Sequence, residues 1–194
     1  MKHFFLKTCI VASVCSIALL QGCKSGQSDV APAAAANSGT RPAAAGESVS
    51  TSGAFYSSWI SPASWGARTN AANYVNYRYS TPNIPRLDQA MLDQGAILVY
   101  ARFGGVSGET FPVPFQRIWS RTNSGVGLAY EKWGFQATLN QITVTIDPEI
   151  NGYNPPTDVQ LRYVLITGDA ATGRKAHVDY SNYEEVKAAY NLVD

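Results

Sequence analysis

The fold is decided by one stretch with a strict two-residue period, QITVTI at residues 141–146. Successive side chains of a β-strand point to opposite faces of its sheet. Ile142, Val144 and Ile146 would therefore face a core while the polar residues between them face water. The stretch predicts a strand with one buried face.

Other strand-like stretches lie on both sides of this one. Residues 96–103 begin with a run that is apolar on both faces, and residues 161–166 are similar, so both are predicted to be central strands. Residues 74–79 are rich in tyrosine, which favours strands. Weaker strand candidates, separated by Gly and Pro turns, are residues 57–60, 111–115, 116–119, 126–130 and 135–138.

Two short helices are predicted. Residues 86–94 place Leu87 and Met91 four positions apart and end at Gly95, a residue typical of helix C-termini. Residues 181–184, Ser-Asn-Tyr-Glu, fit a capping box that would start a last helix. The predicted fold class is all-β, an antiparallel β-sandwich with a short helical turn before a central strand and a C-terminal helix closing an edge or an end.

The start of the chain has the pattern of a lipoprotein signal peptide, residues 1–22. Lys2 and Lys7 precede an uncharged apolar run at residues 10–20, which is about half of the roughly 20 residues that span a bilayer. Leu20-Gln21-Gly22 then precedes Cys23 as in a bacterial lipobox, in which the cysteine thiol carries the lipid. The alternative is an ordinary signal peptide cut near Cys15 or Cys23. Lys24 is not the Asp that is typical of inner-membrane retention, so we expect the outer membrane, on a face that the sequence leaves open.

Composition changes sharply after the signal region. Residues 23–52 are almost entirely small and polar, with two Ala/Pro-rich runs, and are expected to be a flexible tether because they cannot bury enough apolar area to fold. All 11 tyrosines and all 4 tryptophans follow it. Residues 53–194 are therefore predicted to be one β-sandwich domain of ordinary size.

Charge and cysteine content exclude several classes of function. The chain has 15 Lys and Arg against 14 Asp and Glu, without the basic cluster that nucleic-acid binding requires. No cysteine follows Cys23, so the mature domain has no disulfide, thiolate metal site or cysteine nucleophile. We expect no cofactor, and no partner other than the membrane and an unidentified envelope glycan or protein.

The loop after the deciding strand resembles the first half of a calcium-binding loop. Asp147, Glu149 and Asn151 place oxygen ligands at alternate positions, Gly152 is sixth and Asp158 twelfth. An EF-hand has flanking helices and usually Glu at position twelve, neither of which is expected here. A polar connection between strands is the favoured interpretation, with a calcium site as the alternative.

Three other patterns suggest chemistry without completing it. Residues 168–175 have the glycine spacing of a P-loop, but a P-loop requires Gly-Lys-Ser/Thr and the triplet here is Gly173-Arg174-Lys175, followed by Ala176. His177 and Asp179 would share a face if they lay on a strand, although no nucleophile motif accompanies them. A pair of carboxylates that acts on glycosidic bonds can meet in space without any sequence pattern, so a weak hydrolase using acidic residues such as Asp147, Glu149 or Asp158 stays an alternative.

The tryptophans suggest a binding surface. Trp59, Trp65, Trp119 and Trp133 could stack on sugar rings or hold a peptide, although Trp in β-proteins is more often part of the core. A glycan- or peptide-binding module that uses exposed Trp or Tyr is therefore a second alternative.

Four segments resemble a family of small Gram-negative, Bacteroidetes-type envelope lipoproteins of uncharacterised function. They are residues 92–100, 111–115, 162–166 and 179–187, and the similarity extends over most of residues 59–194. Thr167-Gly168 follows the third segment where the family usually has Pro-Gly. The resemblance implies a β-sandwich on a lipid tether and supplies no catalytic residues. We therefore expect a membrane-anchored lipoprotein with a non-catalytic binding or structural role.

Overall fold

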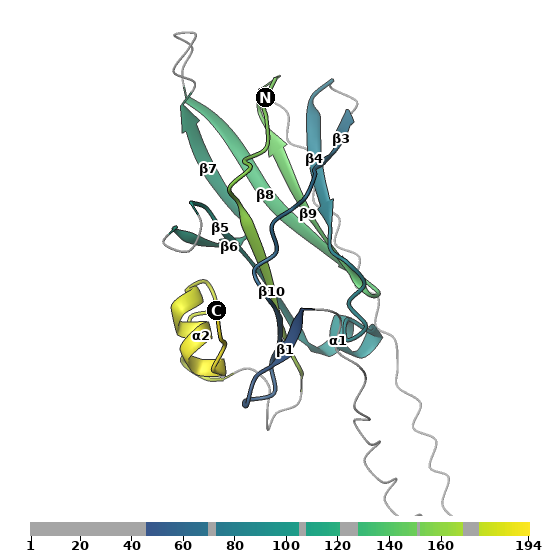
Figure 1. Ribbon diagram of the computed structural model, residues 1–194, viewed down its shortest axis with the longest axis vertical. Helices are drawn as coiled ribbons and strands as arrows, with labels where there is room; N and C mark the ends of the chain where they lie inside the picture. Colours follow the sequence, from purple (N-terminus) through teal and green to yellow (C-terminus); the bar gives the residue numbers. More distant parts are fainter. Residues whose placement is uncertain (1–45, 70–72, 105–107, 121–127, 151, 169–174) are drawn as a thin grey trace, which may run out of the picture. The chain divides into compact units, whose positions relative to one another are not determined.

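The computed structural model describes residues 46–69, 73–104, 108–120, 128–150, 152–168 and 175–194. All of them belong to the compact unit Thr40–Asp194. The expected signal peptide, the expected lipidation residue Cys23 and most of the expected tether lie outside the described residues. The described part consists of two β-sheets and two helices (Figure 1).

Sheet A has five antiparallel strands in the order β1-β2-β10-β5-β6. They are β1 (Glu47–Val49), β2 (Phe55–Ser57), β5 (Ala96–Arg102), β6 (Thr110–Val113) and β10 (Gln160–Ile166). β10 and β5 lie inside the sheet and pair along their whole lengths, from Gln160 opposite Arg102 to Ile166 opposite Ala96. The prediction that both are central strands is confirmed.

Sheet B has five antiparallel strands in the order β3-β4-β9-β8-β7. They are β3 (Gly66–Thr69), β4 (Val75–Ser80), β7 (Phe115–Ser120), β8 (Leu128–Thr138) and β9 (Gln141–Pro148). The deciding stretch forms most of β9 at the centre of this sheet, and Ile142, Val144 and Ile146 are each at most 1% exposed. Its predicted alternation is confirmed, whereas the described part of the candidate at 126–130 and the candidate at 135–138 both belong to the single strand β8.

The main core lies between the two sheets and makes them a sandwich. Its buried residues include Val99, Ala101, Leu161, Tyr163 and Leu165 from sheet A and Trp133, Ile142, Val144 and Ile146 from sheet B. Alternate residues of the same strands face this core because the side-chain period of a strand is two. The fold is an all-β antiparallel β-sandwich, as the sequence predicts.

The first helix, α1 (Gln89–Gln94), precedes the central strand β5. The Oδ1 of Asp88 accepts a hydrogen bond from the Met91 amide at 3.0 Å, so Asp88 caps the helix start. Gly95 ends the helix in an extended conformation, and a Cβ built there would lie 2.7 Å from the Met91 carbonyl oxygen. Close approach therefore requires glycine at this position.

The second helix, α2 (Tyr183–Tyr190), has a different cap from the predicted capping box of Ser181 and Glu184. The side chain of Asn182 accepts hydrogen bonds from the amides of Glu184 and Glu185 at 3.1 and 3.4 Å. Ser181 instead donates from its hydroxyl and its amide to Asp179, at 2.6 and 2.9 Å. The predicted capping box is wrong by one position because Ser and Asn are both good N-caps, and the tertiary structure uses Asn182.

The position of α2 also differs from the prediction that it closes an edge or an end. Tyr183, Val186 and Tyr190 pack with Tyr100 and Val164, which lie on the face of sheet A turned away from the main core. Central strands that are apolar on both faces need cover on both sides. Helix α2 supplies this cover for sheet A, so the domain has a second, smaller core.

The sheet begins earlier than the composition indicates. Strand β1 lies within residues 23–52, the stretch expected to be tether, and pairs with β2 from Glu47 opposite Ser57 to Val49 opposite Phe55. It has only three residues and occupies the outer position of sheet A. A strand this short buries little apolar area, which explains why its composition resembles that of a tether.

Candidate functional site

The structure separates the tryptophans that were considered as a binding surface. Trp133 is 2% exposed and lies in the main core. Trp59 and Trp65 are half-buried, and the Trp119 side chain lies outside the part of the structure that is described. Among the tryptophan side chains that the structure describes, the candidates for a binding surface are therefore Trp65 and Trp59.

Trp65 lies beside an open hollow with a volume of about 370 Å³, which we call the Trp65 hollow. It is lined by residues 62–65, Tyr77 and residues 155–157. The first segment leads from sheet A into β3, Tyr77 lies on β4, and the last segment leads from β9 back to sheet A. The hollow thus lies where two connections pass between the sheets, a common location for binding residues.

Two aromatic contacts support the Trp65 ring. Its centroid lies 5.6 Å from that of Trp133 with an interplanar angle of 89°, and 6.0 Å from that of Tyr79 with an angle of 60°. Both are the edge-to-face arrangements that aromatic rings prefer. Since Trp133 and β4 belong to the sandwich, the rigid part of the fold positions Trp65.

Tyr77 is fixed in a similar way. Its hydroxyl donates to the backbone oxygen of Tyr153 at 2.6 Å, and the two ring centroids are 5.7 Å apart. The Tyr153 hydroxyl in turn donates to Glu131 Oε2. Burial and the neighbouring Glu131 carboxylate raise the pKa of Tyr153 well above its ordinary value, so this hydroxyl stays protonated and remains a donor.

Glu131 is a buried charged residue that the sequence analysis missed. It is fully buried, and its Oε1 accepts hydrogen bonds from Arg117 Nε at 2.6 Å and Trp133 Nε1 at 3.1 Å. The Arg117 guanidinium also lies over the Phe103 ring at 4.1 Å. The signal was present, because Glu131 is in phase with Trp133 on an alternating strand and had to point the same way.

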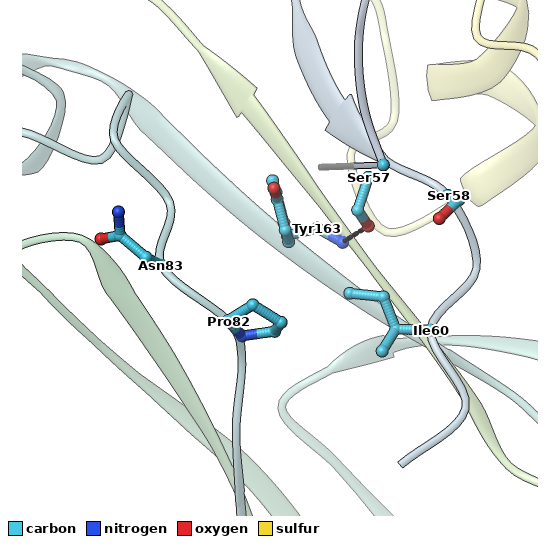
Figure 2. Close-up of a pocket in the computed structure, with 7 residues that line it drawn as sticks. Ser57, Ser58, Ile60, Pro82, Asn83 and Tyr163 are labelled. Carbon is cyan, nitrogen blue, oxygen red and sulfur yellow. Dashed lines mark hydrogen bonds between the residues drawn. The ribbon is translucent and has the colours of Figure 1, made fainter. Parts of the chain in front are cut away.

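A second hollow, of about 250 Å³, has a different chemistry. Figure 2 shows Ser57, Ser58 and Ile60 on one side and Pro82 and Asn83 on the other, with Tyr163 between them. The Ser57 hydroxyl accepts a hydrogen bond from the Tyr163 amide at 3.2 Å.

No charged or histidine side chain lines this second hollow in the described part of the chain. Burial raises the pKa of the Tyr163 phenol, so it stays neutral. The second hollow therefore offers neutral hydrogen-bonding groups, and its described lining includes no base to activate a nucleophile.

Trp59 takes part in a cluster of cations and aromatic rings on the helix side of sheet A. The guanidinium carbons of Arg102 and Arg162 lie 4.0 and 4.9 Å from its ring centroid. Arg162 is only 1% exposed and donates to Val193 O at 2.8 Å and to Asp194 Oδ1 at 3.2 Å. Trp59 and Arg162 thus help to hold residues 193–194 against the sheet.

The Asp194 carboxylate is the anionic partner of this cluster. It accepts hydrogen bonds from Lys187, from Trp59 Nε1 at 3.3 Å and from the Tyr183 hydroxyl at 3.1 Å. Burial alone would favour its protonated form, but these hydrogen bonds outweigh burial and lower its pKa to about 2.

The low pKa of Asp194 predicts an acid-sensitive contribution to stability. Since the folded-state value is depressed below 3.8, this contribution is present above about pH 4 and is lost as the pH falls towards about 2. Urea unfolding should show a steeper loss of stability between these pH values for the wild type than for Asp194→Asn. Parallel curves for the two proteins would contradict the prediction.

The residues considered for calcium lie at the end of β9 and in the connection from β9 to β10. Glu149 forms an ion pair with Lys132 at 2.9 Å, and Asp158 Oδ2 accepts a hydrogen bond from the Gly104 amide at 3.1 Å. Asp147 lies opposite Lys132 in the sheet, and Asn151 lies outside the described residues. Within the described ranges, no group of three His, Cys, Asp or Glu residues is placed to hold a metal ion.

The two remaining patterns are the pair of His177 with Asp179 and the P-loop-like residues 168–175. His177 is exposed in a turn with φ of 68°, not on a strand, so the expected shared face with Asp179 does not form. The Asp179 carboxylate accepts hydrogen bonds from the hydroxyl and the amide of Ser181, and these lower the pKa of Asp179. Of the P-loop-like segment, residues 169–174 lie outside the described residues.

The described fold and the Trp65 hollow define a class, an all-β sandwich domain with a covering helix and an aromatic hollow between its connections. No family model matches the chain, and neither a curated protein nor a solved structure was found to be similar to it. The helices in the described part of the chain are too short or too polar to cross a membrane.

Proposed function

We propose that the protein is a lipid-anchored, non-catalytic binding module of the cell envelope whose ligand occupies the Trp65 hollow. The observation that carries the proposal is the fixed pair of aromatic side chains, Trp65 and Tyr77, at an open hollow of about 370 Å³. Binding sites typically combine preformed apolar walls with a few polar groups, in volumes of about 300–1,000 Å³.

The non-catalytic part of the proposal is supported by the chemistry of the Trp65 hollow and of the hollow around Tyr163. Neither lining includes an acidic residue, a histidine or a cysteine among the described residues. Asp147 and Glu149, which the hydrolase alternative would use, line a separate open hollow of about 400 Å³ with Tyr74 and Pro148, and there Glu149 forms an ion pair with Lys132. General acid–base catalysis needs such groups within hydrogen-bond reach of the substrate.

The anchor is supported by the lipobox-like residues that precede Cys23 and by the tether composition that follows. In this proposal the lipid on Cys23 holds the domain at the outer membrane, and the protein belongs with the envelope lipoproteins that it resembles. Cys23→Ser should move the protein from the membrane fraction to the soluble fraction of the cells that produce it. Unchanged membrane association would remove the anchor from the proposal. Protease treatment of intact cells would show which face the domain occupies.

The binding role is tested by screening the full chain, purified in detergent, against an array of envelope glycan fragments and peptides. We expect saturable binding of at least one array member without turnover. Thr157→Lys, at the exposed rim of the hollow, should abolish binding, whereas the same change at exposed Thr138 on β8 should not. Turnover that is abolished by substituting Asp147, Glu149 or Asp158 would establish the hydrolase alternative, and an array without any bound member would contradict the binding role.

A further inference from the structure

We infer that the ligand of the Trp65 hollow is an uncharged, proline-containing peptide segment in an extended conformation. This inference rests on the proposed binding function and deepens it by naming the class of ligand. It follows from the charge of the hollow, the kinds of residue that line it and the rigidity of its walls.

The lining carries no charged side chain. Its members are three prolines, one alanine, Ser64, Thr157, Trp65 and Tyr77. A charged group on a ligand would lose water at this surface without gaining an opposite charge, which is unfavourable. The hollow therefore selects a neutral stretch of ligand.

The combination of Trp, Tyr and Pro is the chemistry of surfaces that bind proline-rich segments. Such segments dock their polyproline II helix into aromatic-lined grooves, and they lose little entropy because that conformation is already populated when free. Here Trp65 and Tyr77 provide the aromatic faces, and half-buried Pro155 and Pro156 lie on the opposite connection.

Trp65 also has a donor to offer. Its indole N–H donates to none of the described residues, whereas the indoles of Trp59 and Trp133 each donate to a carboxylate. A half-buried indole N–H normally has a partner. A backbone carbonyl of an extended peptide, which proline retains although it lacks the amide, is a suitable acceptor.

The walls of the hollow are held in place before any ligand arrives. Trp65 packs edge-on against Trp133, and Tyr77 is hydrogen-bonded to Tyr153 O at 2.6 Å. The prolines have fixed φ angles. Preorganised walls lower the entropic cost of binding on the side of the protein. A proline-rich peptide loses little entropy on its own side, so the total entropic cost is low.

A glycan is less well matched to this lining. The hydroxyl groups of a sugar ring need several side-chain partners, and the described lining supplies only the hydroxyls of Ser64, Thr157 and Tyr77. The Tyr77 hydroxyl already donates to Tyr153 O. The chemistry of the Trp65 hollow therefore favours a peptide over a glycan.

The inference is tested by calorimetric titration of the full chain, purified in detergent, with an end-blocked deca-proline peptide. The expected result is saturable binding that is about three- to tenfold weaker for Trp65→Phe, which keeps an aromatic ring of smaller size and loses the indole N–H. Thr157→Lys should weaken binding by more than about tenfold, while the matched variant Thr138→Lys should bind as the wild type does. Circular dichroism melting of each variant checks that it is folded.

Three outcomes would overturn the inference. One is no binding of deca-proline by the wild type, and another is equal binding by the wild type and Thr157→Lys. The third is binding of an end-blocked Gly/Ser decapeptide with the same affinity, which would remove the requirement for proline. If a hexamer of N-acetylglucosamine binds instead and Thr157→Lys abolishes that binding, the ligand class is wrong while the binding function stands.

Discussion

Replacing Glu131 with alanine is expected to lower the free energy of unfolding by about 3–5 kcal/mol, because it leaves a half-buried cation and two buried donors without their acceptor. The three groups are Arg117 Nε, Trp133 Nε1 and the Tyr153 hydroxyl. Urea unfolding followed by tryptophan fluorescence measures the change. Glu131→Gln keeps one acceptor oxygen and should cost less than the alanine variant.

The double variant Arg117→Met, Glu131→Leu tests whether stability is lost because the ion pair is absent or because one charge is left without its partner. Replacing a whole buried ion pair with apolar residues of similar size is often nearly neutral, whereas removing one partner is costly. We therefore expect the double variant to be more stable than Arg117→Met alone. A Glu131→Ala variant that unfolds within about 1 kcal/mol of the wild type would show that the carboxylate does not hold this part of the core together.

Trp133→Ala is expected to destabilise the protein by about 3–5 kcal/mol, since it removes a large side chain from the main core and leaves a cavity. Trp133 is 2% exposed, stacks on Phe115 with centroids 5.4 Å apart and supports the edge of Trp65. Urea unfolding again gives the magnitude. The loss should not add to that of Glu131→Ala, because the two side chains are hydrogen-bonded.

Two further variants serve as controls for Trp133→Ala. Trp133→Phe keeps an aromatic ring and should cost less than the alanine variant. Leu139→Ala removes an apolar side chain that is 55% exposed and should change stability by less than about 0.5 kcal/mol. A loss for Trp133→Ala as small as that for Leu139→Ala would contradict the place of Trp133 in the core.

The strands were the most predictable part of the fold. The two-residue period of residues 141–146 requires one buried face, and β9 has it. The order of the strands could not be predicted, because pairing joins residues far apart in the chain, such as Val164 and Tyr56. Short β1 escaped prediction because its place depends on pairing with β2 and not on its own composition.

The candidate site was less predictable than the fold. The sequence singled out the tryptophans as a type, but not which of them would be half-buried, since exposure depends on how the sheets pack. Nothing local in the sequence indicates that the loop with Pro155 and Pro156 meets Trp65. Glu131 could have been placed in the core from its phase with Trp133, but its partner Tyr153 lies 22 residues away.

The ion pair of Arg117 and Glu131 also has a consequence for self-association of the protein at high concentration. Arg117 lies on β7, which occupies an outer position in sheet B, and its side chain points inward to Glu131. Outer strands offer unpaired backbone groups to neighbouring molecules, and an inward-facing charge is one means by which proteins discourage such pairing. A second molecule that added a strand beside β7 would have to accommodate this charge. The same ion pair that stabilises one molecule should thus help to keep many molecules apart.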